Sequence, residues 1–166
     1  SAVTGATVEV LWKAEHGWDQ NRDPFLFYWG DMYARFWWPN LRFETSSTSG
    51  SDNFSINLQE AGQRTWSYYK KGWHHFAFVY NATSGIKQVY VDGVLSAGMS
   101  KGVAGGTITN GTNQQLVLGL NTTFSSGTMS FDEVTFYNQA ITANQVYSNY
   151  LNAMAGNHYT FQLATP

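Results

Sequence analysis

The stretch 73–96, WHHFAFVYNATSGIKQVYVDGVLS, contains two β-rich segments and two turn signals. The first segment, 73–80, is mostly apolar and aromatic, and the second, 86–91, is rich in β-branched and aromatic residues. The cluster 81–85 between them consists mainly of residues that favour turns. Asp92-Gly93 is a strong hairpin signal, because a type I′ turn needs positive φ at both central positions. The stretch therefore predicts antiparallel strands joined by tight turns.

The rest of the chain continues this pattern of short β-rich segments and turns. Residues 66–69 are expected to be extended, with Trp66 and Tyr68 on one face, and the Gly-, Ser- and Thr-rich segment 97–113 is expected to be a long loop. Thr142 is a candidate N-cap for one short helix near 142–154, in which Val146, Tyr150 and Met154 lie at helical spacing. Further strands are predicted at 7–12, 25–29, 32–38, 41–45, 53–59, 115–120, 128–137 and 158–163, with a weak one at 107–109. Together these elements predict an all-β fold, a two-sheet antiparallel β-sandwich of the jelly-roll type with one short helix.

Length and composition limit the class of protein. At 166 residues the chain is expected to be a single module, 1–166, excised from a larger protein. Charged residues make up only 12% and aromatic residues 17% of the chain, and the net charge is −2. Nucleic acid and anionic membranes are poor partners for such a surface, because they require clustered Lys and Arg. No apolar run approaches the roughly 18 residues that a membrane-spanning helix needs, so membrane insertion is not expected.

The chain has no cysteine, which excludes disulfides, thiolate metal sites and cysteine nucleophiles. A neutral surface rich in Ser, Thr, Asn and Gly is typical of extracellular β proteins. The predicted location is therefore secreted or at the cell surface.

Three blocks of the sequence resemble one family. The hairpin 73–96 is similar to the pattern W-x-H-v-A-v-x-Y, turn, Y-v-D-G of laminin-G-like, concanavalin A-like jelly-roll domains. The segments 116–119 and 124–142 resemble the ending of these domains, and 7–12 resembles an early strand. The resemblance implies a lectin-like domain of a group that mostly binds sugars or partner surfaces and includes fewer enzymes. The aromatic segment 25–44 matches no part of the family pattern.

Catalytic signals are weak. Glucanases of this superfamily carry paired carboxylates in a pattern like E-x-D-x-x-E, and retaining enzymes need two carboxyl groups about 5 Å apart. The chain has no such run, and the consecutive pair Asp132-Glu133 would point to opposite faces of a regular strand. His74 and His75 also face opposite ways, and the resemblance implies a structural role for His75. The module is predicted to be non-catalytic, and a glucanase-type hydrolase survives only if two carboxylates converge across strands.

A structural calcium ion is the one cofactor that the resemblance implies. Its only named ligand is Asp132, which in the family anchors a loop or helps to hold the ion. Asp19, Asp23 and Asp31 could add oxygen ligands. Calcium is left open.

The aromatic residues suggest where a ligand binds. Trp12 and Trp73 fall on family core positions, whereas Tyr33, Arg35 and Trp37 alternate along 32–38 and share a face opposite Met32, Ala34 and Phe36. Exposed rings beside planar polar groups suit neutral sugars, because a ring packs on sugar C–H groups while the polar groups bind hydroxyls. The alternative is that these rings pack the two sheets. The candidate ligand-binding residues are Trp18, Asp19, Trp29, Tyr33, Arg35, Trp37, Trp66 and Tyr68.

The leading hypothesis is a non-catalytic carbohydrate-binding module that recognises a polysaccharide or glycan through this aromatic strip and nearby loops. The alternative is an adhesion or assembly module of a surface adhesin, appendage or virion protein. In either case other domains of the parent chain are further candidate partners.

Overall fold

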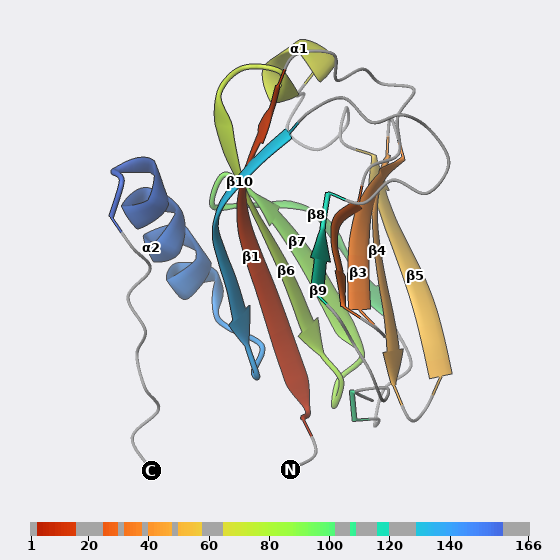
Figure 1. The fold of residues 1–166 in the computed structure, drawn as a ribbon. Helices are drawn as coiled ribbons and strands as arrows, with labels where there is room; N and C mark the ends of the chain where they lie inside the picture. The colour runs from red at the N-terminus through yellow and green to blue at the C-terminus, as the bar shows by residue number, and fades with distance from the viewer. Residues whose placement is uncertain are drawn as a thin grey trace.

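A computed structural model describes residues 3–15, 25–29, 32–37, 40–47, 50–57, 65–101, 107–108, 116–119 and 129–157. These residues form two five-stranded antiparallel sheets stacked face to face, with a helix outside one of them (Figure 1). The predicted all-β sandwich with one short helix near 142–154 is confirmed.

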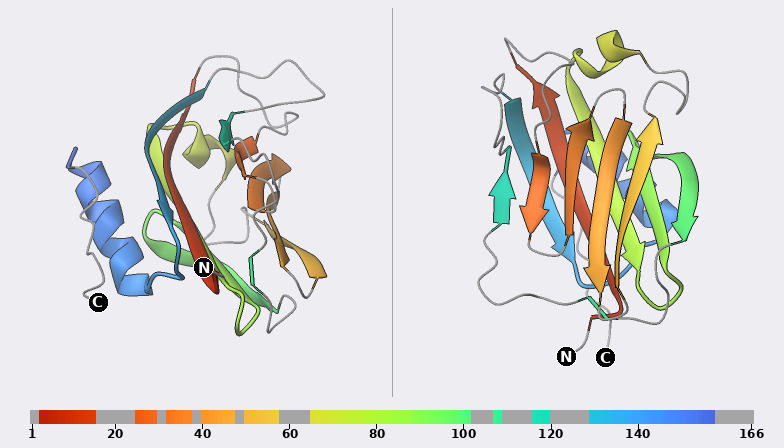
Figure 2. Two further views of the ribbon diagram at one scale, coloured as in Figure 1. Left: turned by 60° about the horizontal axis from the view of Figure 1, so that its bottom comes forward. Right: turned by 90° about the vertical axis from the view of Figure 1, so that its right-hand side faces the viewer.

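We call the first sheet the hairpin sheet, because it contains the segment 73–96. Its strand order is β10-β1-β6-β7-β8 (Figure 2). The second, the aromatic sheet, has the order β5-β4-β3-β2-β9. The hairpin sheet comprises β1 (Gly5–Ala14), β6 (Trp73–Asn81), β7 (Ile86–Val91), β8 (Val94–Lys101) and β10 (Met129–Tyr137). The aromatic sheet comprises β2 (Phe25–Trp29), β3 (Met32–Trp37), β4 (Asn40–Ser47), β5 (Gly50–Asn57) and β9 (Leu116–Leu118).

Aromatic rings fill the space between the two sheets. The ring of Trp12 lies 5.0 Å from that of Phe36, and Phe78 lies 5.3 Å from Phe27 and 5.4 Å from Phe43. All of these side chains are fully buried. Because the inner face of each sheet is covered in this way, only the outer faces and the ends of the sandwich can receive a ligand.

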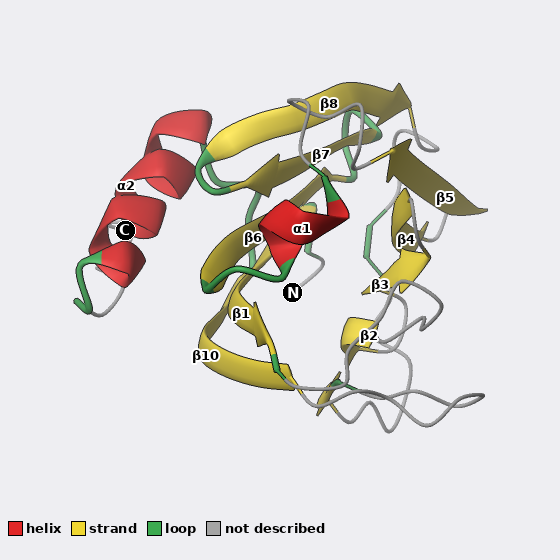
Figure 3. Cartoon of the chain, turned by 90° about the horizontal axis from the view of Figure 1, so that it is seen from above, coloured by secondary structure: helices red, strands yellow, loops and turns green. Residues whose placement is uncertain are grey.

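Helix α2 (Ala143–Met154) covers the outer face of the hairpin sheet (Figures 1 and 3). Its predicted N-cap is confirmed, since the Thr142 hydroxyl accepts a hydrogen bond of 3.2 Å from the Gln145 backbone N–H. Val146 packs on the sheet as expected, but Met154 is 48% exposed. The buried side chains of the helix are Val146, Asn149 and Ala153. The polar Asn149 faces the sheet because its side-chain amide donates a hydrogen bond to the buried carboxylate of Glu9.

The predicted type I′ hairpin is confirmed, since Asp92 has φ 52° and Gly93 has φ 75°. The predicted loop at 97–113 is wrong at its start, because β8 continues to Lys101. The hairpin turn aligns this edge strand with β7, so that Val94 lies opposite Val91 and Lys101 lies opposite Ile86. Main-chain hydrogen bonds hold such a pair together, so apolar side chains are not required. The weak strand at 107–109 is represented by a single bridge between Val3 and Ile108. The predicted strand at 158–163 lies outside the described residues.

The prediction that residues 66–69 are extended is also wrong. These residues form the short helix α1 (Trp66–Tyr69) at one end of the sandwich, seen from above in Figure 3. The Tyr68 backbone N–H bonds to the Thr65 carbonyl, and the Tyr69 ring is buried against Phe76, 6.3 Å away. One turn of helix brings Tyr69 into the core, whereas an extended segment would place neighbouring rings on opposite faces.

Gly93→Ala is expected to destabilise the fold by about 1–3 kcal/mol. Gly93 has φ +75°, and an added Cβ would lie 2.8 Å from Tyr150 Cδ1 and 2.9 Å from Tyr147 Cδ2. Both the backbone and the packing of α2 would therefore be strained. Urea unfolding measures the effect, and a variant as stable as the parent would contradict the turn geometry.

Candidate functional site

The outer face of the aromatic sheet carries the residues predicted to bind a ligand. Met32, Ala34 and Phe36 of β3 are buried in the core, so the alternate residues Tyr33, Arg35 and Trp37 point outward. Trp37 is 44% exposed. Neighbouring strands add to this set, and we define the outer strip as Phe25 and Tyr28 of β2, Tyr33, Arg35 and Trp37 of β3, and Arg42 and Glu44 of β4.

Strand pairing brings these side chains together. Tyr28 lies opposite Tyr33, and Tyr33 lies opposite Glu44 on the other side. Arg35 lies between Phe25 on β2 and Arg42 on β4. Residues directly opposite one another on antiparallel strands share a face, so a row of side chains runs across three strands.

Rings and guanidinium groups alternate along the outer strip. The Tyr33 ring lies 5.5 Å from Phe25 and 5.7 Å from Tyr28. The Arg42 guanidinium lies 3.8 Å from the centre of the Trp37 ring. The Arg35 guanidinium lies 5.2 Å from the same ring and 5.8 Å from Phe25. Such cation–π contacts fix the side chains in place, which makes the strip a preorganised surface.

Glu44 is the polar anchor of the strip. Its carboxylate accepts a hydrogen bond from the Tyr33 hydroxyl and lies 3.5 Å from Arg42 Nη1. Burial, reinforced by the hydrogen bond to Glu44, raises the pKa of Tyr33 to about 12. Tyr33 therefore stays protonated at neutral pH, and its hydroxyl is held against Glu44.

Arg35 differs from Arg42 in its surroundings. No carboxylate of a described residue pairs with Arg35, and its Nε donor is enclosed without a hydrogen-bond partner. Its two Nη atoms are not among the enclosed unpartnered groups. Arg35 is half-buried, and its guanidinium lies between the rings of Phe25 and Trp37.

The other predicted ligand-binding residues lie elsewhere. Trp29 points to the opposite side of β2, where its ring packs 5.4 Å from Phe136 and against the core. The Tyr68 hydroxyl donates to Asp92. Trp66 begins α1, and its side chain is not described. Trp18 and Asp19 lie outside the described residues.

Sequence reasoning missed four members of the strip. Arg42 and Glu44 alternate with Leu41 and Phe43, so pairing of β4 with β3 could have placed them beside Arg35 and Tyr33. Phe25 and Tyr28 could not be placed by simple alternation. A bulge between Phe25 and Phe27 turns two consecutive residues inward, which breaks the two-residue period.

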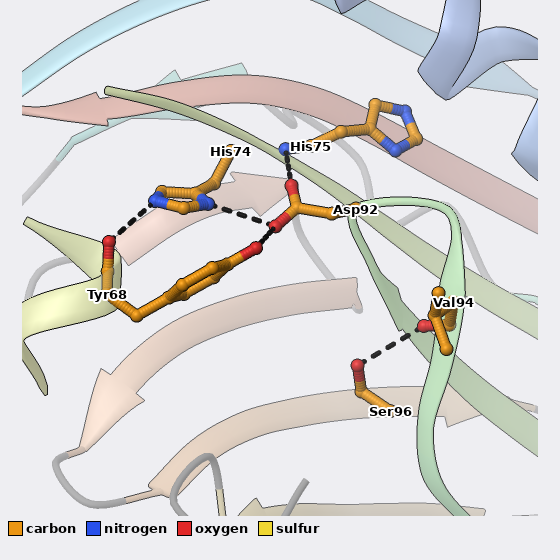
Figure 4. Close-up of polar contacts among 6 residues, drawn as sticks. All are labelled: Tyr68, His74, His75, Asp92, Val94 and Ser96. Carbon is orange, nitrogen blue, oxygen red and sulfur yellow. Dashed lines mark hydrogen bonds and ion pairs between the residues drawn. The ribbon is translucent and has the colours of Figure 1, made fainter. Parts of the chain in front are cut away.

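A second polar cluster surrounds Asp92 in the hairpin turn (Figure 4). Asp92 Oδ2 accepts a hydrogen bond from the Tyr68 hydroxyl and lies 3.0 Å from His74 Nδ1. Asp92 Oδ1 accepts from the His75 backbone N–H at 2.9 Å. Burial alone would raise the pKa of Asp92, but the hydrogen bonds from His74, Tyr68 and His75 outweigh it and hold this pKa below its ordinary value.

This cluster fastens α1 to the hairpin rather than forming a catalytic arrangement. The second His74 nitrogen, Nε2, lies 3.0 Å from the Tyr68 carbonyl, so protein groups engage both ring nitrogens. The nearby Ser96 hydroxyl donates to the Val94 carbonyl and has no bond to His74 (Figure 4). A serine nucleophile needs a histidine base within hydrogen-bond reach, and this pair does not supply one.

His75 points to the other side of β6, as predicted from the alternation. It is fully buried beneath α2, with Nε2 3.4 Å from Glu9 Oε1. Glu9 Oε2 accepts a 2.7 Å hydrogen bond from Asn149, which also donates to the Tyr137 hydroxyl at 2.9 Å. Burial, with the nearby Glu9 carboxylate, raises the pKa of Tyr137. Because α2 seals these groups from solvent, they attach the helix to the sheet and are closed to a substrate.

Asp132 and Glu133 lie at a β-bulge in β10, where the pairing with β1 shifts between Glu9 and Leu11. Asp132 is exposed, its Oδ1 accepts from the Glu133 backbone N–H at 2.8 Å, and Glu133 has φ 47°. Strict alternation, assumed for this pair from the sequence, does not hold at such a bulge. Across the described ranges no group of three or more His, Asp or Glu side chains could hold a metal ion, and calcium at Asp132 stays a prediction.

Neither helix in the described part of the chain has the length and apolar character needed to cross a membrane.

Comparisons with solved structures identify the same fold. The receptor-binding domain of botulinum neurotoxin D matches with a TM-score of 0.70 and 11% sequence identity, over 93% of this chain and 39% of that chain. The binding domain of botulinum neurotoxin serotype G gives 0.69 and 12%, over 91% and 37% of the two chains. The binding domain of Paraclostridial Mosquitocidal Protein 1 gives 0.67 and 14%, over 91% and 37%. The chain thus spans well under half of each of these proteins, and at such identities the likeness shows the fold alone.

No curated protein matches the chain by sequence. The family model described as the concanavalin A-like lectin/glucanases superfamily matches residues 4–147. This range includes both sheets, the hairpin and the start of α2. Since the match covers most of the sequence, the chain belongs to the concanavalin A-like lectin/glucanases superfamily.

Proposed function

We propose that this protein is a non-catalytic carbohydrate-binding module that holds a glycan on the outer strip. The observation that carries the proposal is a row of partly exposed rings interleaved with fixed polar groups on an outer sheet face that no described helix covers. Sugar rings present C–H groups that pack on aromatic faces and hydroxyls that bind carboxylate and guanidinium groups. Trp37 would supply the packing surface, and Glu44 and the two arginines the polar contacts.

The catalytic alternative receives little support. The buried carboxylates Glu9 and Asp92 are engaged by protein groups, and Glu44 is bonded to Tyr33 and Arg42. We therefore place the module outside the enzyme class, as the binding part of a secreted or cell-surface protein. Trp18, Asp19 and Trp66 remain candidates for the rim of the site, and a structural calcium at Asp132 remains part of the proposal.

Affinity electrophoresis on a panel of neutral and acidic polysaccharides, with calcium present, tests the function. At least one polysaccharide in the gel is expected to retard the protein, and addition of that ligand is expected to quench or shift tryptophan fluorescence. Absence of retardation across neutral, uronate, sialylated and sulfated chains would refute a carbohydrate-binding role.

The second candidate is an adhesion or assembly module, and one observation favours it. Helix α2 exposes Tyr147, Leu151 and Met154 at 50%, 49% and 48%, and these positions lie along one side of the helix. Exposed apolar patches often mark protein contacts. Self-association in sedimentation experiments that disappears in Leu151→Glu, without any carbohydrate binding, would favour this candidate over the first.

A further inference from the structure

The outer strip carries an uncompensated positive charge. Its charged members are Arg35, Arg42 and Glu44, and Arg42 is the one that contacts the carboxylate. Arg35 is left over, on a protein whose net charge is −2. A cationic side chain without a carboxylate partner in the strip suggests that the ligand itself supplies the missing anion.

Arg35 is also held in one position. Its guanidinium lies between the rings of Phe25 and Trp37, at 5.8 Å and 5.2 Å. The enclosed Nε has no hydrogen-bond acceptor, so the two ring contacts are what position the side chain. A planar guanidinium can bind both oxygens of a carboxylate at once. The surrounding rings lower local hydration and strengthen such a pair.

We propose that the ligand is an acidic glycan, and that Arg35 binds the carboxylate of one sugar while Trp37 and Phe25 pack on the sugar rings beside it. This inference rests on the proposed function, since it names the class of glycan that the outer strip recognises. Uronic acids and sialic acids both present such a carboxylate. Their shared chemistry is a planar, singly charged group attached to a sugar ring.

The test compares each acidic polymer with its own methyl ester, which keeps the sugars and removes the charge. Polygalacturonate, alginate and polysialate are titrated by calorimetry in both forms. At least one free acid is expected to bind about tenfold or more tightly than its ester, in line with a hydrogen-bonded charge pair. The difference is expected to shrink as salt rises, because ions screen surface charges. The polymer that shows the preference identifies the source of the carboxylate.

Arg35→Gln is expected to reduce the affinity for the free acid to that for the ester, while affinity for the ester changes little. Arg35→Lys keeps the charge but loses the planar pair of donors, so it is expected to recover only part of the preference. Lys71→Gln removes one charge from an exposed turn away from the strip and is the matched control. It is expected to behave like the parent protein.

Two results overturn the inference and are distinguishable from failure of the proposed function. Equal or tighter binding of the esters or of neutral polysaccharides, with no effect of Arg35→Gln, would show a carbohydrate-binding module of another specificity. Preference for sulfated chains over all carboxylated ones would also overturn it. Failure to bind any carbohydrate would instead remove the proposed function itself.

Discussion

Asp92→Ala is expected to lower the free energy of unfolding by about 3–5 kcal/mol. The substitution removes the acceptor for the Tyr68 hydroxyl, His74 Nδ1 and the His75 backbone N–H. His74 and the His75 backbone are buried, so water cannot readily replace these bonds. The loss would also release α1 from the hairpin. Urea unfolding followed by tryptophan fluorescence measures the change.

Asp92→Asn is the matched control, because asparagine tolerates the positive φ of this position and retains one acceptor oxygen. A smaller loss of about 1–3 kcal/mol is expected. Asp92→Ala with nearly parental stability would contradict the structural role assigned to this cluster.

The Asp92 carboxylate is expected to make the fold less stable at acidic pH. Its pKa is lowered in the folded state, so its contribution is complete above the ordinary value of 3.8 and disappears as pH falls through the folded pKa. The stability difference between the parent and Asp92→Asn should therefore be constant near neutral pH and shrink below about pH 4. A difference that grows on acidification would contradict the assignment.

Trp37→Ala is expected to weaken carbohydrate binding by about tenfold, because covering a large apolar side chain contributes about 1.5–3 kcal/mol. Trp37 is 44% exposed, so its removal leaves no core cavity. Stability should fall by no more than about 1 kcal/mol through the lost contact with Arg42. Binding is measured by titration calorimetry and stability by thermal unfolding.

Tyr147→Ala is the control for Trp37→Ala. Tyr147 is also aromatic and is 50% exposed, but it lies on α2, outside the opposite sheet. Unchanged binding is expected. Equal loss of affinity in both variants would point to a general effect on the fold, and loss in Tyr147→Ala alone would move the site to α2.

The fold could be predicted from the sequence wherever a strong local rule coincides with tertiary structure. Asp92-Gly93 adopts the turn that its residue types favour, and Thr142 caps the helix that follows it. The strand predicted at 7–12 lies within β1, and its residues Val8, Val10 and Trp12 pack in the core between the sheets. Prediction failed where pairing with a neighbour decides the structure, as in β8, whose Gly- and Ser-containing sequence has little strand preference of its own.

Part of the candidate site was predictable for the same reason. Tyr33, Arg35 and Trp37 lie in a regular strand, so a period of two placed them on one face. The bulge in β2 hid Phe25 and Tyr28, and the partners of Glu44 depend on strand pairing. Tyr68 was assigned to ligand binding from an extended reading, and the helical turn at α1 instead directs it to Asp92. The positions of Phe25, Tyr28 and Glu44 depend on long-range strand register, which a single sequence does not contain.

Radical footprinting of the aromatic side chains, with and without a saturating polysaccharide ligand, tests the location of the site most directly. The outer strip predicts protection of Trp37, Tyr28 and Tyr33, with the modification of Tyr147 unchanged. Protection of Tyr147 or of Trp18, with full reactivity of Trp37 in the complex, would contradict binding at the outer face of the aromatic sheet.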